Sequence, residues 1–412
     1  MAVKNKIYSR PHLIISTSSP ELELILCCAR TRLNSAELEQ IELLLQQQLD
    51  WDYLITTAKL HKVIPLMYFN LARRHEVAAR VPTSVLTRLR TEAMGIARHN
   101  LLFVRELSTL TQLFADAGLQ VIPYKGLLLA ASIYGDLSLR QFVDLDFLVA
   151  KEEYLAAQTL LLTRGYYRPA QNHVDWECSF AHRQRRIGVD LHQGLTPAYF
   201  PFHVDFPSLW QRLQPVSVGG VKVKSFAPED LLIILCVQLA KDSQWTAEVL
   251  LKVCDIAELL RSYPDLDWSF VARQCKKLGT KRILWFALGV TQCLLQAQLP
   301  ESVEQKIQGD KIVRRAVDRV CSEFFQRSEQ SFRDRTYVER PYLIKLARER
   351  WQDKLHYFWQ TAIRPNQEDW GFISLPKQLF FLYYLLRPVR LMLKYFGYER
   401  LQSEGSQTKA SE

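Results

Sequence analysis

Apolar and polar positions recur with two different periods along the chain, and the change of period divides it. Residues 20–118 carry apolar side chains three and four positions apart, which is the spacing of amphipathic helices. The stretch 119–149, LQVIPYKGLLLAASIYGDLSLRQFVDLDFLV, instead consists of short apolar runs broken at Lys125-Gly126 and at the polar turn 135–140. This pattern predicts a strand, a glycine turn, a helix, a loop and a second strand.

Strand-like patterns continue to residue 226 and helical patterns follow them. Short strands are expected at 166–169, 175–182 and 187–193. Alternation on both sides of Gly219-Gly220 predicts a hairpin over 215–226, and apolar stripes after Pro228 predict further helices. The predicted fold class is therefore α+β. It combines a small mixed or antiparallel sheet and its flanking helices with a predominantly helical body.

Five parts are expected along the chain: a disordered lead (1–18), an N-terminal helical region (19–118), the core with the sheet (119–226), a C-terminal helical region (227–400) and a disordered tail (401–412). No low-complexity linker separates them, so the sheet and its helical flanks are expected to form one compact body. No run of eighteen apolar residues predicts a transmembrane helix, and the basic N-terminus lacks the apolar region of a signal peptide. These features predict a cytoplasmic protein. The eight cysteines fit that compartment, since no C-x-x-C pair occurs among them.

Two aspartates interrupt the apolar run 143–149. Residues two apart in a strand point to the same face, so Asp144 and Asp146 share one side while Val143, Leu145 and Phe147 are expected to pack on the other. Two carboxylates this close repel each other unless a cation lies between them. A divalent metal bound by aspartate oxygens is the usual solution.

The turn upstream of this strand has complementary chemistry. Gly126, between a strand and a helix, allows the backbone to approach anionic oxygens closely, and Lys125 adds a positive charge there. Arg140, in the loop that enters the aspartate strand, can offset charge that develops on phosphates. A phosphate-binding turn followed by paired carboxylates is typical of metal-assisted phosphoryl or nucleotidyl transfer.

A third carboxylate lies in the predicted strand IGVDLHQ, residues 187–193, where Asp190 and His192 share a face. If this strand is antiparallel and adjacent to 143–149, Asp190 meets Asp144 and Asp146. His192 has two interpretations, a residue that orients a carboxylate or contacts substrate, and a strand-end histidine at the surface. In the helical region, Lys252 and Asp255 either pair along a helix or line a substrate pocket, and His61 is expected to lie in a core.

The order Lys-Gly, short helix, Tyr-Gly-Asp, Arg and Asp-x-Asp resembles the nucleotidyltransferase superfamily that contains DNA polymerase beta. More narrowly, residues from about 50 to about 395 resemble the bacterial "uncharacterised nucleotidyltransferase" family, whose core has the same order of motifs and a V-D-L-H sequence, here residues 189–192. In the wider superfamily the turn usually has Gly-Ser, whereas this chain has Gly126-Leu127 and lacks that hydroxyl.

The resemblance implies a metal-dependent enzyme that moves an NMP from an NTP, such as ATP, to an unknown acceptor hydroxyl and releases pyrophosphate. Two Mg²⁺ or Mn²⁺ ions would be bound by Asp144, Asp146 and Asp190, and the phosphates would lie on Lys125, Gly126 and Arg140. A protein of the same fold that binds nucleotide as a sensor or scaffold, without turnover, is the alternative.

The net charge of +10 is concentrated near the C-terminus, because residues 310–400 hold eighteen Lys/Arg against eleven Asp/Glu. Such an excess can attract nucleic acid or an anionic membrane surface, or it can simply keep a protein in solution. The segment 375–398 is apolar and then basic. We expect it to dock onto the helical body, and contact with a membrane is the alternative.

Overall fold

The computed structural model describes residues 19–169, 173–174, 176–185, 187–197, 200, 202–203, 205–245, 250–334, 346, 348–365, 369, 371, 373 and 375–392. The chain forms two compact units, one of residues 1–197 and 202–347 and the other of residues 198–201 and 348–412. The expectation of a single compact body is therefore wrong, since the helices after residue 348 pack mainly on one another. The predicted lead 1–18 and tail 401–412 lie outside the described residues, and the five-part division remains a prediction.

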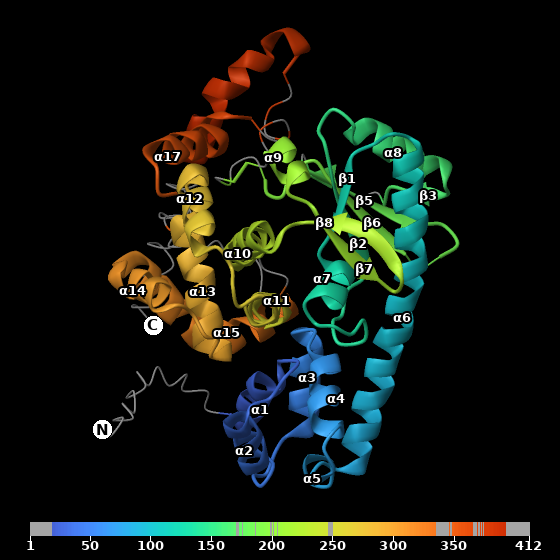
Figure 1. Ribbon diagram of the computed structural model, residues 1–412. Coiled ribbons are helices and arrows are strands. Elements are labelled where there is room, and N and C mark those ends of the chain that lie inside the picture. The colour runs from blue at the N-terminus through green and yellow to red at the C-terminus, as the bar shows by residue number, and fades with distance from the viewer. Residues whose placement is uncertain are drawn as a thin grey trace, which may run out of the picture. The chain divides into compact units, whose positions relative to one another are not determined.

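The first helices of unit 1 are α1 (Pro20–Cys28), α2 (Ser35–Leu44), α3 (Trp51–Leu60), α4 (Ile64–Ala72), α5 (His75–Ala78) and α6 (Thr83–Asp116). Helix α2 begins at a capping box, in which Asn34 and Glu37 each accept a hydrogen bond from the backbone N–H of the other. Helix α6 is long enough to pack against α4 at one end and the sheet at the other (Figure 1).

The sheet contains β1 (Val121–Tyr124), β2 (Asp144–Val149), β3 (Tyr166–Tyr167), β4 (His173–Val174), β5 (Glu177–His182) and β6 (Gly188–His192). Its strand order is β1-β2-β6-β5-β3, with β4 paired to β5. Strands β2 and β6 are parallel, and the other pairs are antiparallel. The predicted α+β class with a small mixed sheet is confirmed.

Of the two conditions set for residues 187–193, adjacency to 143–149 is met, and the antiparallel direction is not, because the two strands pair in parallel. After β2 the chain passes through α8 (Tyr154–Thr163) and β3, and it then returns along β5 in the antiparallel direction. The turn from β5 to β6 reverses the chain once more, so β6 runs the same way as β2.

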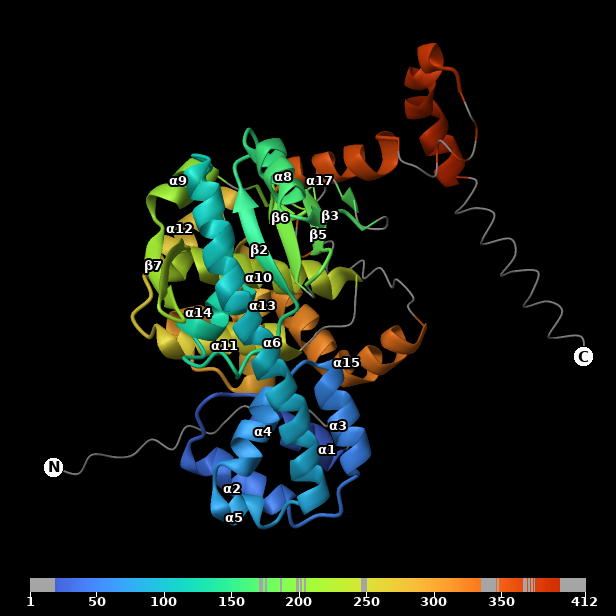
Figure 2. The ribbon, with the colours of Figure 1, turned by 90° about the vertical axis from the view of Figure 1, so that its right-hand side faces the viewer.

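Helices α6 and α8 supply the apolar core against one face of the sheet (Figure 2). Phe114 of α6 packs edge-to-face on Phe147 of β2, with ring centroids 5.5 Å apart. Leu145 is buried on this side as expected, whereas Val143, which precedes the strand, is exposed. The alternation of β2 leaves Asp144 and Asp146 on the opposite face.

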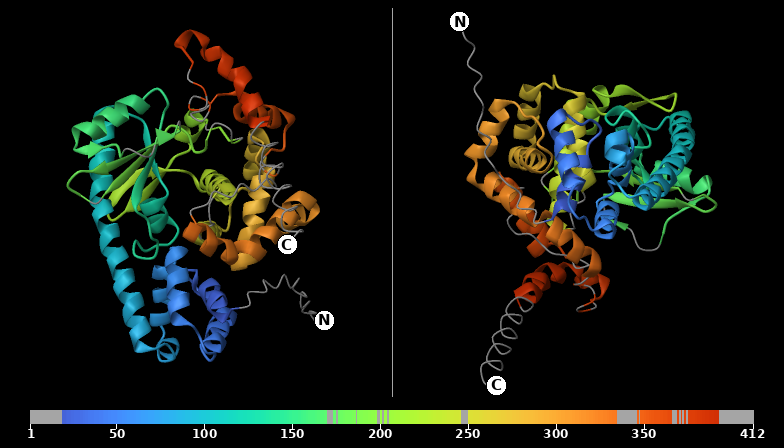
Figure 3. Two further views of the ribbon diagram at one scale, coloured as in Figure 1. Left: turned by 180° about the vertical axis from the view of Figure 1, so that it is seen from behind. Right: turned by 90° about the horizontal axis from the view of Figure 1, so that it is seen from below.

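Helix α7 (Gly126–Ser132) follows β1, and the predicted hairpin is confirmed as β7 (Gln214–Val218) and β8 (Val221–Ser225) after the short α9 (Phe206–Gln211). The remaining helices of unit 1 are α10 (Pro228–Trp245), α11 (Leu250–Ser262), α12 (Trp268–Leu278), α13 (Lys281–Leu295), α14 (Glu301–Gly309) and α15 (Lys311–Asp334). Helix α13 contacts each of the other five, and Figure 3 shows this yellow-to-orange group from behind and from below.

Unit 2 contains α17 (Trp351–Phe358), the π-helical turn η1 (Trp359–Ile363), the 3₁₀ helix η2 (Lys377–Leu382) and a helix over 383–392. No helix among the described residues is long and apolar enough to cross a membrane.

His61 is a core residue, as expected. Its ring stacks on Phe324 with ring centroids 5.5 Å apart, and its Nδ1 accepts a hydrogen bond from the backbone N–H of Leu250, 3.2 Å away. Burial lowers the pKa of His61 to about 4. The contact ties the start of α11 to the N-terminal helices.

This burial predicts a pH-dependent stability. Below pH 6.5 the unfolded chain protonates His61 and the folded chain does not, so stability is lost as the pH falls from 6.5 toward 4. The loss is about 3 kcal/mol, from the lowering of the pKa to about 4. Unfolding measured across this range should depend less steeply on pH in His61→Gln, which keeps an acceptor but does not titrate. An identical pH dependence in both proteins contradicts the prediction.

Candidate active site

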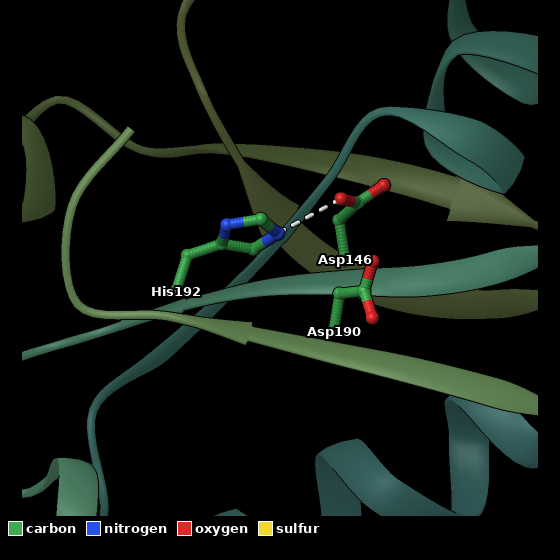
Figure 4. A group of neighbouring side chains, drawn as sticks. All are labelled: Asp146, Asp190 and His192. Carbon is green, nitrogen blue, oxygen red and sulfur yellow. Dashed lines mark hydrogen bonds and ion pairs between the residues drawn. The ribbon is translucent and has the colours of Figure 1, made fainter. Parts of the chain in front are cut away.

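The parallel pairing of β2 and β6 brings together positions that are 44 residues apart along the chain. Asp146 lies opposite Asp190, and Leu148 lies opposite His192. A carboxylate oxygen of Asp146, one of Asp190 and a ring nitrogen of His192 all lie within 4.8 Å of one another (Figure 4). The described part of the chain contains no second group of this kind. Asp144 is two residues before Asp146 on β2 and is outside this group.

The electrostatics of the three carboxyl groups differ. Burial raises the pKa of Asp144 to about 7, and the charges of Asp146 and Asp190 add to this effect. The pKa of Asp190 is also raised to about 7, by burial and then by Asp146 and Glu177. For Asp146, burial is outweighed by Lys125 and His192, which hold its pKa well below the usual range. Asp146 is thus ionised at neutral pH, and ionising the other two adds uncompensated negative charge.

His192 is almost fully buried, so the interpretation of a surface histidine is wrong. Its Nε2 lies 2.9 Å from Oδ1 of Asp146, and its Nδ1 lies 3.4 Å from Oε2 of Glu177. Burial lowers the pKa of His192 to about 4, against the opposing effect of Asp146. A neutral imidazole in this position either orients the carboxylate of Asp146 or offers a nitrogen to a cation.

The turn between β1 and α7 has an unusual backbone. Lys125 has φ 59° and ψ −158°, a region that glycine occupies almost alone, and Gly126 has φ 39°. A Cβ at Gly126 would lie 3.3 Å from the carbonyl oxygen of Asp144, so a side chain there would crowd the start of β2. In this conformation Nζ of Lys125 reaches Oδ1 of Asp146 at 3.2 Å and lies 4.7 Å from the ring centroid of Tyr124.

Arg140 does not join this group. It is buried, and its Nε and Nη2 each donate a 2.8 Å hydrogen bond to the carboxylate of Asp255 on α11. The hydroxyl of Tyr134 donates to the same carboxylate at 2.8 Å. The expected pairing of Lys252 with Asp255 along the helix is therefore wrong: Asp255 binds Arg140, and Lys252 forms an ion pair with Asp242.

Sequence reasoning missed Lys241, which lies near the carboxylates together with Lys252, the lysine for which a place in a substrate pocket was one of the two predictions. Lys241, near the end of α10, lies 4.5 Å from the ring centroid of Trp176 and 3.5 Å from Oδ1 of Asp242, so Lys241 and Lys252 approach the same carboxylate. Burial lowers the pKa of Lys241 to about 8, with repulsion from Lys125. It lowers the pKa of Lys252 to about 7, with repulsion from Lys241, Lys125 and Lys62. A lysine that ends the apolar run LLIILCVQLA was the available signal in the sequence.

These side chains suit a divalent cation. Two carboxylates and an imidazole provide hard oxygen donors and one nitrogen, a combination that binds Mn²⁺ readily and is compatible with Mg²⁺ bound mainly through oxygen. The pKa values of Asp144 and Asp190 are raised because their surroundings disfavour the ionised forms, and a bound cation would stabilise those ionised forms.

Comparison with known protein families finds a match over more than half of the chain. The model of a family described as "uncharacterised nucleotidyltransferase" matches residues 47–296, which include the N-terminal helices from α3 on, the whole sheet and the helices through α13. No curated protein matches the chain.

Proposed function

Because the chain belongs to the family of uncharacterised nucleotidyltransferases, we propose that it transfers an NMP from an NTP to an acceptor hydroxyl and releases pyrophosphate. One observation carries the proposal: the ligand atoms of Asp146, Asp190 and His192 lie within 4.8 Å of one another on one face of the sheet. Lys125 contacts Asp146, Lys241 lies over the ring of Trp176, which lies beside His192, and Lys252 is close enough to both lysines to repel them. Metal ligands beside a cluster of cations fit a polyphosphate substrate.

Asp146 and Asp190 are the proposed ligands of Mg²⁺ or Mn²⁺, and Asp144 is the third carboxylate that a second ion would require. When bound, such ions neutralise phosphate charge and lower the pKa of an attacking hydroxyl. Lys125 holds the carboxylate of Asp146 in place through its 3.2 Å contact. His192 contacts the same oxygen of Asp146 and, because its imidazole is neutral, leaves the negative charge of the carboxylate in place.

Lys241 and Lys252, together with Lys125 of the turn, are the proposed partners of the triphosphate. Arg140, which the sequence suggested for this role, has its guanidinium bound by the buried Asp255. The ammonium groups of Lys241 and Lys252 instead converge on Asp242 and repel each other. A polyphosphate placed between them and the carboxylate group would relieve that repulsion and orient the α-phosphate toward the metal ligands.

The proposal is tested by incubating the full chain with each labelled NTP and Mg²⁺ or Mn²⁺. Release of pyrophosphate together with labelled product supports transfer. The proposal of transfer activity is overturned if the folded chain binds NTP but no NTP yields pyrophosphate, even in extracts that supply varied acceptors.

That second outcome would favour a nucleotide-binding sensor without turnover. Two observations favour it: Leu127 stands where the superfamily usually has a serine hydroxyl, and Arg140 is engaged inside the protein. The three aspartates, all retained on one sheet face, favour the enzyme.

Substitutions of single lysines separate the binding of NTP from the positioning of the Asp146 carboxylate. A charge-assisted contact to phosphate is worth about 1.5–3 kcal/mol, so Lys241→Ala should weaken NTP affinity roughly ten- to a hundredfold. Lys125→Ala should weaken it as much, and kcat/KM should fall further because Asp146 loses its partner. Calorimetry with Mg²⁺ present measures the affinity, and Lys222→Ala, which changes an exposed lysine of β8, is the control. Unchanged affinity in both variants removes the proposed phosphate site.

A further inference from the structure

Unit 2 exposes a row of large apolar side chains that runs from the end of η2 along its last described helix. Phe381, Leu385, Val389 and Met392 are spaced four, four and three residues apart, so they lie along one side of the segment 381–392. Each is between 54% and 68% exposed. Apolar side chains scattered singly over a surface need no explanation, but a continuous row marks an interaction site.

The opposite side of this segment is fixed inside unit 2 by polar groups. Asp369 is buried and accepts 2.6 Å hydrogen bonds from Arg387 and from Arg390. The hydroxyl of the buried Tyr383 donates to the carbonyl of Ile373 at 2.7 Å and accepts from the N–H of Leu375 at 3.0 Å. The helix therefore points its charged side inward and its apolar side outward, the reverse of the usual surface helix.

Helix α17 and η1 present a second row. Trp351, Leu355, Phe358 and Trp359 fall at positions i, i+4, i+7 and i+8 and are between 52% and 67% exposed. The ring centroid of Trp359 lies 6.2 Å from that of Tyr384, so the two rows meet within unit 2. We call the combined surface the apolar face; it consists of Trp351, Leu355, Phe358, Trp359, Phe381, Tyr384, Leu385, Val389 and Met392.

The composition of residues 348–400, the stretch that supplies the apolar face, indicates what covers it. Residues 348–400 hold nine Lys/Arg against five Asp/Glu and thirteen Phe, Trp and Tyr. Lys354 is exposed within the second row. Tryptophan and tyrosine concentrate where a membrane meets water, and lysine and arginine are attracted to anionic headgroups. A second copy of the chain would bring the same excess of positive charge against itself, which opposes association.

We propose that unit 2 binds the surface of an anionic lipid bilayer through the apolar face. The outward rows enter the boundary between headgroups and acyl chains, and the exposed Lys354 and Arg364 remain at headgroup level. By binding Arg387 and Arg390, the buried Asp369 fixes the orientation of the helix about its own axis, so that the apolar row faces outward. This role is independent of the nucleotide site in unit 1.

The test is co-sedimentation of the full chain with vesicles of phosphatidylcholine containing about 30 mol% phosphatidylglycerol, compared with pure phosphatidylcholine. We expect binding to the anionic vesicles that weakens at least about fivefold when NaCl rises from about 50 to about 500 mM. Leu385→Asp should raise the lipid concentration for half-binding at least about tenfold, because a charge replaces an apolar side chain that enters the bilayer. Leu101→Asp, at a leucine of α6 in unit 1 that is 61% exposed against 68% for Leu385, should bind as the unchanged chain does.

Three results overturn the proposal. The first is equal binding to both kinds of vesicle, or none. The second is equal vesicle binding by Leu385→Asp and Leu101→Asp. The third is a different occupant of the apolar face. If Leu385→Asp melts at a lower temperature than Leu101→Asp without lipid, another part of the chain covers the face. If the chain forms a dimer that only Leu385→Asp dissociates, a second copy covers it.

Discussion

Asp190→Asn should abolish pyrophosphate release and at the same time raise the melting temperature of the metal-free protein. The activity falls because a carboxylate ligand that stabilises transition-state charge is worth several kcal/mol, or roughly a thousandfold in rate. The stability rises because Asp190 lies opposite Asp146 on the neighbouring strand, and its ionised form is opposed by burial and by that charge. A folded-state pKa near 7, above the unfolded value, makes ionisation of Asp190 cost stability as the pH rises from about 4 to 7. The gain should therefore be visible at pH 8.

Asp146→Asn provides the matched comparison. It should lose activity to the same extent but gain no stability, since Asp146 is held by Lys125 and His192 and its charge is favourable in the folded protein. Asp265→Asn, at an exposed aspartate, should change neither property. Activity that survives Asp146→Asn or Asp190→Asn at ordinary Mg²⁺ concentrations contradicts metal-dependent transfer at this site.

Arg140→Met should destabilise unit 1 by about 3–5 kcal/mol, the usual cost of removing one partner from a buried ion pair. The variant leaves Asp255 buried without its two hydrogen bonds from the guanidinium. The double variant Arg140→Met with Asp255→Leu should recover much of this loss, because it removes both charges together. Denaturant unfolding measures all three proteins.

The alternative role of Arg140 gives the opposite pattern. If its guanidinium contacts phosphate, Arg140→Met should lower NTP affinity at unchanged stability, and the second substitution should restore nothing. Arg90→Met, at an exposed arginine of α6, is the control for loss of a guanidinium alone. A stable single variant contradicts the structural role that the buried pair implies.

Local patterns predicted the elements around the site well. The run 119–149 is β1, α7 and β2 as expected, because each element is set by its own apolar spacing and by the glycine turn at Gly126. Strand parity alone placed Asp144 with Asp146 and Asp190 with His192. The direction of β6 could not be derived from residues 187–193 and differs from the antiparallel one considered, since it depends on the path through α8, β3 and β5.

The sequence did not indicate which charged side chains form ion pairs with one another. Arg140 and Asp255 both lie in stretches that resemble the family, yet nothing local indicates that they bind each other across more than a hundred residues. The convergence of Lys241 and Lys252 on Asp242 near the carboxylates likewise depends on how α10 and α11 pack.

The sequence by itself determined the α+β class, the strand–turn–helix order and the carboxylates that share a face, because these follow from residue spacing within one element. Only the tertiary structure decided that His192 completes the group with Asp146 and Asp190, that Arg140 is held inside the protein, and that the last described helix turns its apolar side outward. Those outcomes depend on burial and on long-range ion pairs, which arise when distant elements pack and which no local spacing encodes.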